Sequence, residues 1–317
     1  MTLDDIKNII ETNNTFVIFA HENPDGDAVG SGLAMYGILS NLGKKVDIVM
    51  DEFPAVFEYL EGFDKIIKVP SLKSYDVAIA VDCPDLKRIK DDYVPFFNEA
   101  KYRMEFDHHI NNGMYADYCV VDQACPACSQ LLSSTFNYLG YEITSPIAEC
   151  LLTGIITDTG GFRHSGTNSE TFEFAAWCMT KGLNISKIYH NSMMLMTKTK
   201  FEEEKLAMER MEFLADGKIA FTYITKEDDE RIGIEPGDHD GIVEIGRNVK
   251  GVEVSIFLYQ KNDGTYKASI RSNEYVDASE ICILFGGGGH VKAAGTNLKM
   301  TFEEAKKSLI NETIKHL

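Results

Sequence analysis

The sequence has no uninterrupted run of about 18 apolar residues, the length that a membrane-spanning helix requires. Its first residues are acidic and lack the charged-then-apolar pattern of an export signal. Basic residues are scarce, because 31 Lys and Arg stand against 49 Asp and Glu, and the net charge is −18. We therefore expect a cytoplasmic protein with no membrane partner. The charge disfavours a long nucleic-acid track but leaves room for a short phosphorylated ligand.

The seven cysteines also lack the spacing of a zinc ribbon. Cys125 and Cys128 form a CxxC pair, but no second pair stands at the distance such a site needs. An odd number of cysteines without an export signal indicates reduced thiols. We favour a buried helix start at Cys128 over a redox or zinc site.

The length of 317 residues and the hydrophobic content of 44% predict two packed domains. The expected fold is α/β, with an N-terminal parallel sheet, a smaller α/β domain with a mixed sheet, and a cleft between them. We assign residues 1–185 to a catalytic metal-binding domain, 186–215 to a helical linker and 216–317 to a substrate-binding domain.

Hydrophobic periodicity and capping residues place the expected elements. Strands are expected at 16–20, 45–50, 66–69, 75–81, 101–106, 218–224, 252–259 and 265–272, the last two joined by a turn at 262–264. Helices are expected at 3–13, 26–42 and 127–139, then from caps at Ser145, Thr167, Asp277 and Thr301.

Chemically active side chains follow the first of these strands. His21, Asp25 and Asp27 lie on a tight loop after the apolar run 16–20, and Gly26 opens a helix. In open parallel sheets, ligands bind at the carboxyl ends of the strands. A solvated Asn-Pro-Asp-Gly turn is the alternative for this segment taken alone.

The same pattern recurs at other strand ends. Asp82 follows strand 75–81, and Asp107, His108 and His109 follow strand 101–106. Asp158 ends a helix just before two glycines. A purely structural explanation would need several coincidences at one edge of one sheet, so we predict a shared site.

Four carboxylates and two imidazoles suit two divalent cations, with Asp82 as the natural bridge. The set is His21, Asp25, Asp27, Asp82, His108 and Asp158. Because it has no thiolate, manganese fits best, with magnesium, cobalt or zinc as alternatives. Asp107 is expected to orient an imidazole. For His109 we favour a general acid or a phosphate contact over a core histidine.

The C-terminal part offers anion-binding groups. A four-glycine run, 286–289, precedes His290, and such backbone can approach an anion closely. Lys267 and Arg271 share one strand face with Ser269. A flexible loop and a solvated strand face are the respective alternatives.

These motifs, in this order, resemble the four motifs of the DHH phosphoesterase superfamily. The Gly-run with His290 and Ala293-Ala294-Gly295 resembles its DHH-associated C-terminal domain. The layout is similar to the NrnA-like branch of oligoribonucleases and 3′-phosphoadenosine-5′-phosphate (pAp) phosphatases. The resemblance implies a manganese-dependent phosphohydrolase. It implies one metal bound by His21, Asp25 and Asp82, and a second metal bound by Asp27, Asp82, His108 and Asp158. It also implies substrate contacts by His109, Arg271, Gly287, Gly288, Gly289 and His290.

We therefore expect an enzyme that hydrolyses RNA of about two to five nucleotides to nucleoside 5′-monophosphates, together with pAp dephosphorylation. This length range follows from the few local contacts that an acidic protein can offer a polyanion.

The alternatives are a phosphodiesterase for dinucleotides such as pApA or cyclic di-AMP, and a nucleotide sensor with a dead site, which the intact ligand set disfavours. The C-terminal domain disfavours a family II pyrophosphatase, and the length disfavours a RecJ-type exonuclease. The lack of a preceding membrane segment disfavours the membrane-bound phosphodiesterases. The sequence leaves open the direction of cleavage and the oligomeric state, for which a homodimer is one option.

Overall fold

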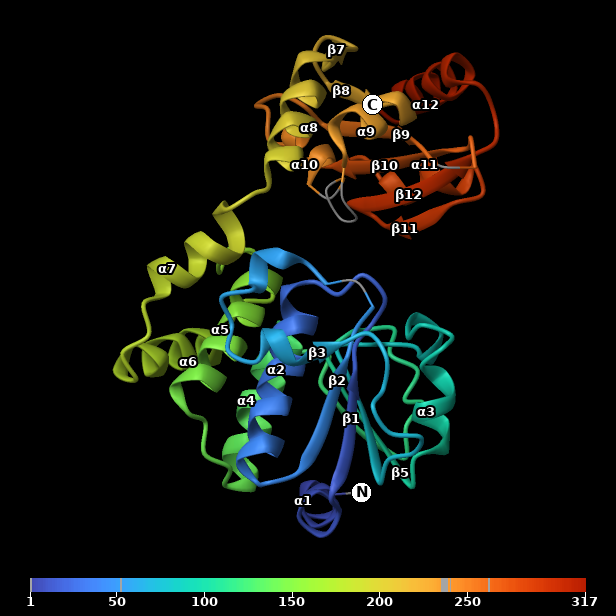
Figure 1. Cartoon of the computed structure of the whole chain (residues 1–317). Coiled ribbons are helices and arrows are strands. Elements are labelled where there is room, and N and C mark those ends of the chain that lie inside the picture. Colours follow the sequence, from blue (N-terminus) through green and yellow to red (C-terminus); the bar gives the residue numbers. More distant parts are fainter. Residues whose placement is uncertain (1, 52, 235–238, 240, 262) are drawn as a thin grey trace. The chain divides into compact units, whose positions relative to one another are not determined.

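The computed structural model describes residues 2–51, 53–234, 239, 241–261 and 263–317. The chain divides into two units, Met1–Leu195 and Met196–Leu317 (Figure 1), and each has its own sheet and its own apolar cores. Among the described residues, no helix is both long and apolar enough to cross a bilayer.

The first unit is built on a six-stranded parallel sheet of order β3-β2-β1-β4-β5-β6. Its strands are β1 (Thr15–Phe19), β2 (Lys45–Val49), β3 (Ile66–Ile67), β4 (Val77–Val81), β5 (Tyr102–Asp107) and β6 (Tyr118–Val121). The apolar runs form central strands because both sheet faces are covered, as in other parallel sheets. The predicted α/β class with a parallel sheet is confirmed.

Helices cover the two faces of this sheet unequally. Helices α1 (Leu3–Thr12), α2 (Gly26–Asn41), α4 (Cys128–Leu139), α5 (Ser145–Asp158) and α6 (Ser169–Thr180) share a large core with one face, which includes Phe16, Ile18 and Ile79. The other face, with Val17 and Phe19, packs against Tyr93 and helix α3 (Val94–Glu99). Alternate residues of β1 thus enter different cores, as strand geometry requires.

Two helix starts differ from the sequence prediction by one residue. The N-cap residue of α5 is Thr144, whereas the sequence predicted Ser145, and Pro146 lies within the first turn of the helix. The capping box of α6 is formed by Asn168 and Thr171, not by Thr167 and Glu170. Adjacent Ser, Thr and Asn residues are nearly equivalent as caps, so packing of the helix decides between them.

The second unit has a mixed six-stranded sheet of order β11-β12-β10-β9-β8-β7. Its strands are β7 (Glu212–Leu214), β8 (Ile219–Ile224), β9 (Val254–Gln260), β10 (Tyr266–Ser272), β11 (Gly288–His290) and β12 (Ala293–Leu298). Strands β8 and β9 are parallel, and the other pairs are antiparallel. The predicted mixed sheet is confirmed. Of the predicted turn between β9 and β10, Asn262 lies outside the described residues.

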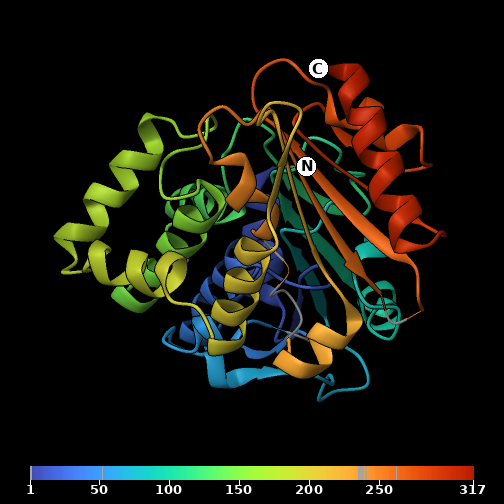
Figure 2. The same ribbon diagram turned by 90° about the horizontal axis from the view of Figure 1, so that it is seen from above.

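Helices also lie on both faces of this second sheet. Helices α11 (Ala278–Ile283) and α12 (Phe302–His316) share a core with Ile219 and Ile270, and Figure 2 shows α12 lying along the strands. Helices α8 (Lys198–Glu209) and α10 (Ile242–Arg247) contribute to a smaller cluster with Phe257. Helix α9 (Lys226–Ile232) follows β8.

The segment 186–215 contains more than a linker helix. It comprises most of α7 (Ile185–Tyr189), a π-helical turn (His190–Met194), α8 and β7. Helix α8 and β7 belong to the second unit, in which Thr222 on β8 donates a hydrogen bond of 2.6 Å to the carbonyl of Ala207 on α8.

Asp228 is the centre of a hydrogen-bond network at the start of helix α9 in the second unit. Its carboxylate accepts hydrogen bonds from the Arg210 guanidinium and from the backbone and hydroxyl of Thr225, the capping residue of α9. Burial would raise the pKa of Asp228, but the hydrogen bonds from Arg210 and Thr225 outweigh it and hold that pKa well below its usual range.

We expect Asp228→Ala to lower the free energy of unfolding of the second unit by about 2 kcal/mol at neutral pH. Because the folded pKa is depressed, this stability is present above the unfolded pKa of about 3.9 and is lost as pH falls below it. Urea unfolding followed by circular dichroism at several pH values measures the difference. Trp177 fluorescence reports the first unit as an internal control. Glu230→Ala, on the exposed side of the same helix, should change little, and an equal loss in both variants would contradict the assignment.

Candidate metal centre

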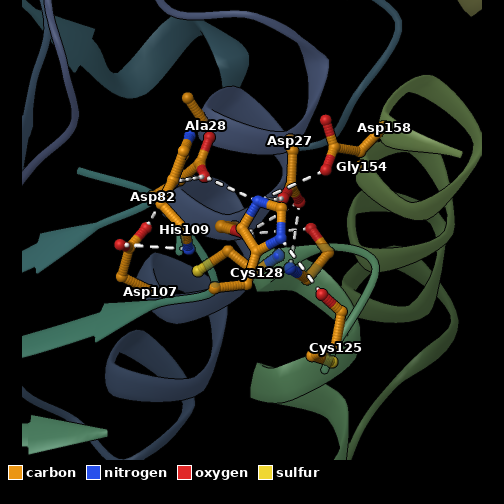
Figure 3. A network of polar contacts seen from close by, with 12 residues as sticks. Asp27, Ala28, Asp82, Asp107, His109, Cys125, Cys128, Gly154 and Asp158 are labelled. Carbon is orange, nitrogen blue, oxygen red and sulfur yellow. Dashed lines mark hydrogen bonds and ion pairs between the residues drawn. The ribbon is translucent and has the colours of Figure 1, made fainter. Parts of the chain in front are cut away.

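The predicted side chains of three strand ends and one helix end meet at the carboxyl edge of the parallel sheet (Figure 3). Loop 21–25 follows β1, Asp82 follows β4, His108 and His109 follow β5, and Asp158 is the last residue of α5. The adjacency of β1, β4 and β5 in the sheet explains why their ends converge. The structure brings all eight predicted residues of the first unit to this edge.

Glycines allow the two central helices to approach each other closely. A Cβ at Gly30 on α2 would lie 2.5 Å from the carbonyl oxygen of Cys150 on α5. A Cβ at Gly154 on α5 would lie 2.5 Å from an Asp27 carboxylate oxygen. These contacts leave no room for a side chain, so the small residues set the distance between the helices that carry Asp27 and Asp158.

Asp27 is held at the start of a third helix. Its side chain is 1% exposed, and the backbone N–H groups of Cys128 and Ser129 donate to its two oxygens at 2.6 and 2.9 Å. These are first-turn amides of α4, where the helix dipole favours negative charge. Cys128 therefore acts through its backbone at a buried helix start, as the sequence indicated.

Asp82 lies between the two halves of the site. It is 2% exposed and adopts a left-handed backbone conformation, with φ of 51°. Its Oδ2 lies 3.7 Å from His21 Nε2, and its Oδ1 lies 3.4 Å from His108 Nε2. Oδ1 is buried without a hydrogen-bond partner in the described part of the protein. Each oxygen thus faces a different imidazole.

Both imidazoles are oriented by backbone carbonyls. His21 Nδ1 lies 2.7 Å from the Glu22 oxygen, and His108 Nδ1 lies 3.2 Å from the Cys125 oxygen. A proton on each Nδ1 leaves the Nε2 lone pair directed into the carboxylate cluster, the arrangement that metal-binding histidines adopt.

His109 has a different partner. Its Nδ1 lies 2.8 Å from Asp107 Oδ1, and the other oxygen of Asp107 accepts a hydrogen bond of 2.6 Å from Asn112. Asp107 is fully buried, whereas the His109 side chain is 32% exposed. The carboxylate therefore fixes the orientation of an imidazole that remains accessible. Asn112 was not singled out from the sequence, because its role depends on the fold of the following loop.

Crowding of like charges perturbs the whole cluster. Burial and the neighbouring Asp82 charge raise the pKa of Asp27 to about 7. Burial and the Asp27 charge raise the pKa of Asp158 to about 8. Burial would lower the pKa of His108, but the close Asp82 carboxylate and the charges of Asp27 and Asp158 raise it to about 10. Without a cation, the site must therefore hold protons to remain stable.

Among the described residues, three groups of side chains have ligand atoms close enough to share a metal ion: His21 with Asp25 and Asp82, Asp27 with His108 and Asp158, and Asp82 with His108 and His109. Their donors are carboxylate oxygens and imidazole nitrogens, and the buried Asp82 Oδ1 has no hydrogen-bond partner among the described residues. The residues present thus fit a divalent metal centre.

A strained turn follows Asp158. Gly160, Gly161 and Phe162 all have positive φ values, of 58°, 71° and 68°. The turn places Arg163 Nε 2.7 Å from the Gly160 oxygen and His164 Nδ1 3.0 Å from the Asp158 oxygen. Neither side chain was singled out from the sequence, although two basic groups within six residues of Asp158 were a usable signal.

The predicted substrate groups of the second unit are present, with two differences. Lys267 and Arg271 lie on the face of β10 opposite the buried Ala268 and Ile270, as expected. Arg271 Nε donates to Glu244 on α10 at 3.0 Å, so this guanidinium already has an acidic partner.

The glycine run is not a flexible loop, which was the alternative that the sequence left open. Gly288, Gly289 and His290 form strand β11, which pairs with β12. A Cβ at Gly287 would lie 2.3 Å from the Gly295 oxygen, and Gly289 has φ of 147°, so close packing between strands explains these two glycines.

Comparison with known proteins agrees with this architecture. Residues 15–155 match the N-terminal domain of the DHH family, and residues 216–317 match the DHHA1 domain. The bifunctional oligoribonuclease and PAP phosphatase NrnA of Thermus thermophilus is 33% identical over 89% of this chain and 83% of its own length. The chain belongs to the DHH family. It is a DHH-type phosphoesterase, and its acidic and histidine groups are positioned for metal.

Two other relatives extend this comparison. An exopolyphosphatase-related protein of Bacteroides fragilis has a TM-score of 0.87 at 26% identity, covering 99% of this chain and 95% of that protein. The cyclic-di-AMP phosphodiesterase PdeA of Listeria monocytogenes is 23% identical over 96% of this chain and 48% of its own length. The chain thus aligns along nearly its whole length with proteins that carry different functional names.

Proposed function

We propose that this DHH protein hydrolyses short oligoribonucleotides, of about two to five residues, to nucleoside 5′-monophosphates, and also converts pAp to AMP. The observation that carries the proposal is the position of Asp82, whose two oxygens face His21 and His108 separately. A carboxylate in that position can bridge two metals. The T. thermophilus relative, named for both activities, supports this choice of substrates.

In this proposal His21, Asp25 and Asp82 hold one metal, and Asp27, Asp82, His108 and Asp158 hold the other. Two divalent ions, once bound, supply an activated water and stabilise the oxygens of the reacting phosphoryl group. The oxygen and nitrogen donors favour Mn²⁺. Both ions would replace the protons that crowding otherwise forces on Asp27 and Asp158.

The remaining residues of the first unit position the substrate and a proton. His109, oriented by Asp107, is placed to contact a phosphate oxygen or to protonate the leaving oxygen. Because Asp107 holds Nδ1, the Nε2 atom is the one available for this transfer. We propose His109 as the catalytic imidazole and Asp107 as the residue that orients it.

The second unit supplies substrate contacts in this proposal. A terminal phosphate or nucleotide binds to a set of cationic and glycine-rich groups, namely Lys267, Arg271, Gly287, Gly288, Gly289 and His290. Glu244 would hold the Arg271 guanidinium extended until a phosphate, which binds Arg in bidentate fashion, joins or replaces it. The division into residues 1–185, 186–215 and 216–317 stays part of this proposal.

Two further features complete the proposal. The seven free thiols suit a reducing compartment such as the cytoplasm.

A dinucleotide phosphodiesterase is the second candidate, favoured by the similarity to PdeA of L. monocytogenes. One panel with Mn²⁺ (pAp, two- to ten-residue RNA, pApA and cyclic di-AMP) ranks the two candidates by kcat/KM.

Asp82→Asn tests the bridge. Asn tolerates the left-handed backbone that Asp82 adopts, so the fold should persist while one negative charge is lost. We expect fewer than two bound Mn²⁺ per chain and a loss of turnover of more than about 100-fold. Metal analysis and turnover of a dinucleotide measure both effects. Asp64→Asn removes an exposed carboxylate of the same unit and should leave both values unchanged. Two tightly bound metals and full activity in Asp82→Asn would rule out the bridge.

Arg271→Ala tests the substrate contact of the second unit. We expect KM for a dinucleotide to rise about tenfold with the bound metal unchanged, because one charged hydrogen bond to phosphate is lost. Arg247→Ala is the matched control, since Arg247 contacts the same Glu244 at 2.7 Å. An equal effect in both variants would show that only the packing around Glu244 had been disturbed.

Substrate length tests the role of bulk charge. At a net charge of −18, phosphates beyond the local contacts meet an acidic protein and gain no binding. We expect kcat/KM to peak at about two to five nucleotides and to depend weakly on salt, because few counterions are released. Measurements from two to about 25 nucleotides decide this. A steady rise with length and a steep inverse salt dependence would indicate a processive nuclease.

A further inference from the structure

A pocket lies beside the metal centre, on the side of β2, and its volume is about 220 Å³. It is lined by residues that follow β1, by the last residue of β2 and the two after it, and by two residues from the segment after β4. All of them belong to the first unit. His21 forms one wall, so the pocket adjoins the metal-ligand group of His21, Asp25 and Asp82. Apart from Glu22, whose carbonyl orients His21, none of its other wall residues has a role in the site described above.

The apolar part of the pocket is firmly built. The Tyr93 ring stacks on Phe19 at 5.6 Å, and its hydroxyl donates to the Lys68 oxygen at 2.8 Å. Met50 is 3% exposed, and its backbone N–H donates to the Ile67 oxygen. Ligand sites are usually preformed in this way, but this volume is below the roughly 300 Å³ of a drug-sized pocket. It therefore suits one sugar or part of one base.

The polar part is an ion pair. Lys90 Nζ lies 2.7 Å from Asp51 Oδ2 and 5.7 Å from the centre of the Tyr93 ring. The hydrogen bond from Lys90 lowers the pKa of Asp51, so this carboxylate is ionised at neutral pH. The Asp51 side chain is 39% exposed, and an ionised carboxylate accepts several hydrogen bonds. A hydroxyl group entering the pocket would therefore meet a fixed acceptor.

The strand order of the sheet indicates which kind of ligand group such an acceptor would bind. The order β3-β2-β1-β4-β5-β6 is that of the dinucleotide-binding fold, in which phosphate binds at the turn after the first strand. In that fold an acidic residue about 20 residues further on accepts a hydrogen bond from a ribose hydroxyl. Asp51 stands two residues after β2, and the turn after β1 carries the metal-ligand group. The analogy concerns only where phosphate and ribose lie on the sheet. In this protein the turn after β1 carries the metal-ligand group, whereas in the dinucleotide-binding fold it carries a glycine-rich motif.

We propose that this pocket is a ribonucleoside subsite, in which Asp51 accepts a hydrogen bond from a ribose hydroxyl of the nucleotide whose phosphate binds at the metal centre. Lys90 holds the carboxylate in place, and Met50 and Tyr93 pack against the sugar and the adjoining edge of the base. The subsite gives the enzyme a means to prefer RNA over DNA fragments of equal length. The inference rests on the proposed function only for the position of the phosphate.

Asp51→Asn tests the subsite by sugar discrimination. Binding of AMP and 2′-deoxy-AMP is measured by calorimetry with Mn²⁺ present, and kcat/KM is measured for pApA and its deoxy analogue. The wild-type protein should favour the ribose form in both assays, and Asp51→Asn should reduce that preference by about tenfold. Asp64→Asn is the matched control, because Asp64 forms a similar ion pair with Lys65, at 2.6 Å, away from the pocket. It should keep the full preference.

Each outcome has one meaning. An unchanged ribose preference in Asp51→Asn, or no preference in the wild type, overturns the subsite. Hydrolysis of bis(p-nitrophenyl) phosphate reports the metal centre without needing a sugar, so its loss in Asp51→Asn would show damage to the centre and also overturns the proposal. If the wild type fails to cleave any dinucleotide yet binds AMP more tightly than 2′-deoxy-AMP through Asp51, the proposed function fails and the subsite stands.

Discussion

The crowding of carboxylates at one sheet edge is the constraint on which the first unit depends. Asp27 and Asp82 are almost completely buried, and the neighbouring charges raise the pKa of Asp27 and of Asp158. Buried like charges are costly unless protons or cations balance them. The surrounding structure lowers that cost only in part, through the amides of α4 and the two imidazoles. The arrangement is therefore one that a cation completes.

Much of this centre could be predicted from the sequence, because its residues are local signals. A buried strand is a continuous apolar run, and a polar residue directly after it must lie at the sheet edge, as Asp82 does. Strand β6 was not predicted, because all four of its residues are only half-buried at the edge of the sheet. The cap at Asn168 instead of Thr167 reflects a choice between adjacent residues that local sequence leaves open.

Other features depend on contacts between distant segments, and the sequence could not supply them. Gly30 and Gly154 are small because α2 and α5 touch there, and nothing near either residue in the chain indicates the other helix. The pairing of Arg271 with Glu244 joins a strand to a helix 27 positions away. The glycine run resembled a loop because glycine is common in loops, whereas close pairing of β11 with β12 requires it here. The pocket beside His21 likewise exists only once β1 and β2 are neighbours.

The two carboxylates grouped with His108 lie next to opposite kinds of helix end. Asp27 accepts amide protons at the start of α4, whereas Asp158 is the final residue of α5, where carbonyl oxygens accumulate negative charge. The start of α4 therefore favours the Asp27 anion, whereas the end of α5 disfavours the Asp158 anion. Burial and neighbouring charges raise the pKa of both groups. In the proposed metal centre, Asp158 would therefore depend more on a bound cation than Asp27, whose charge the two amides of α4 already balance in part.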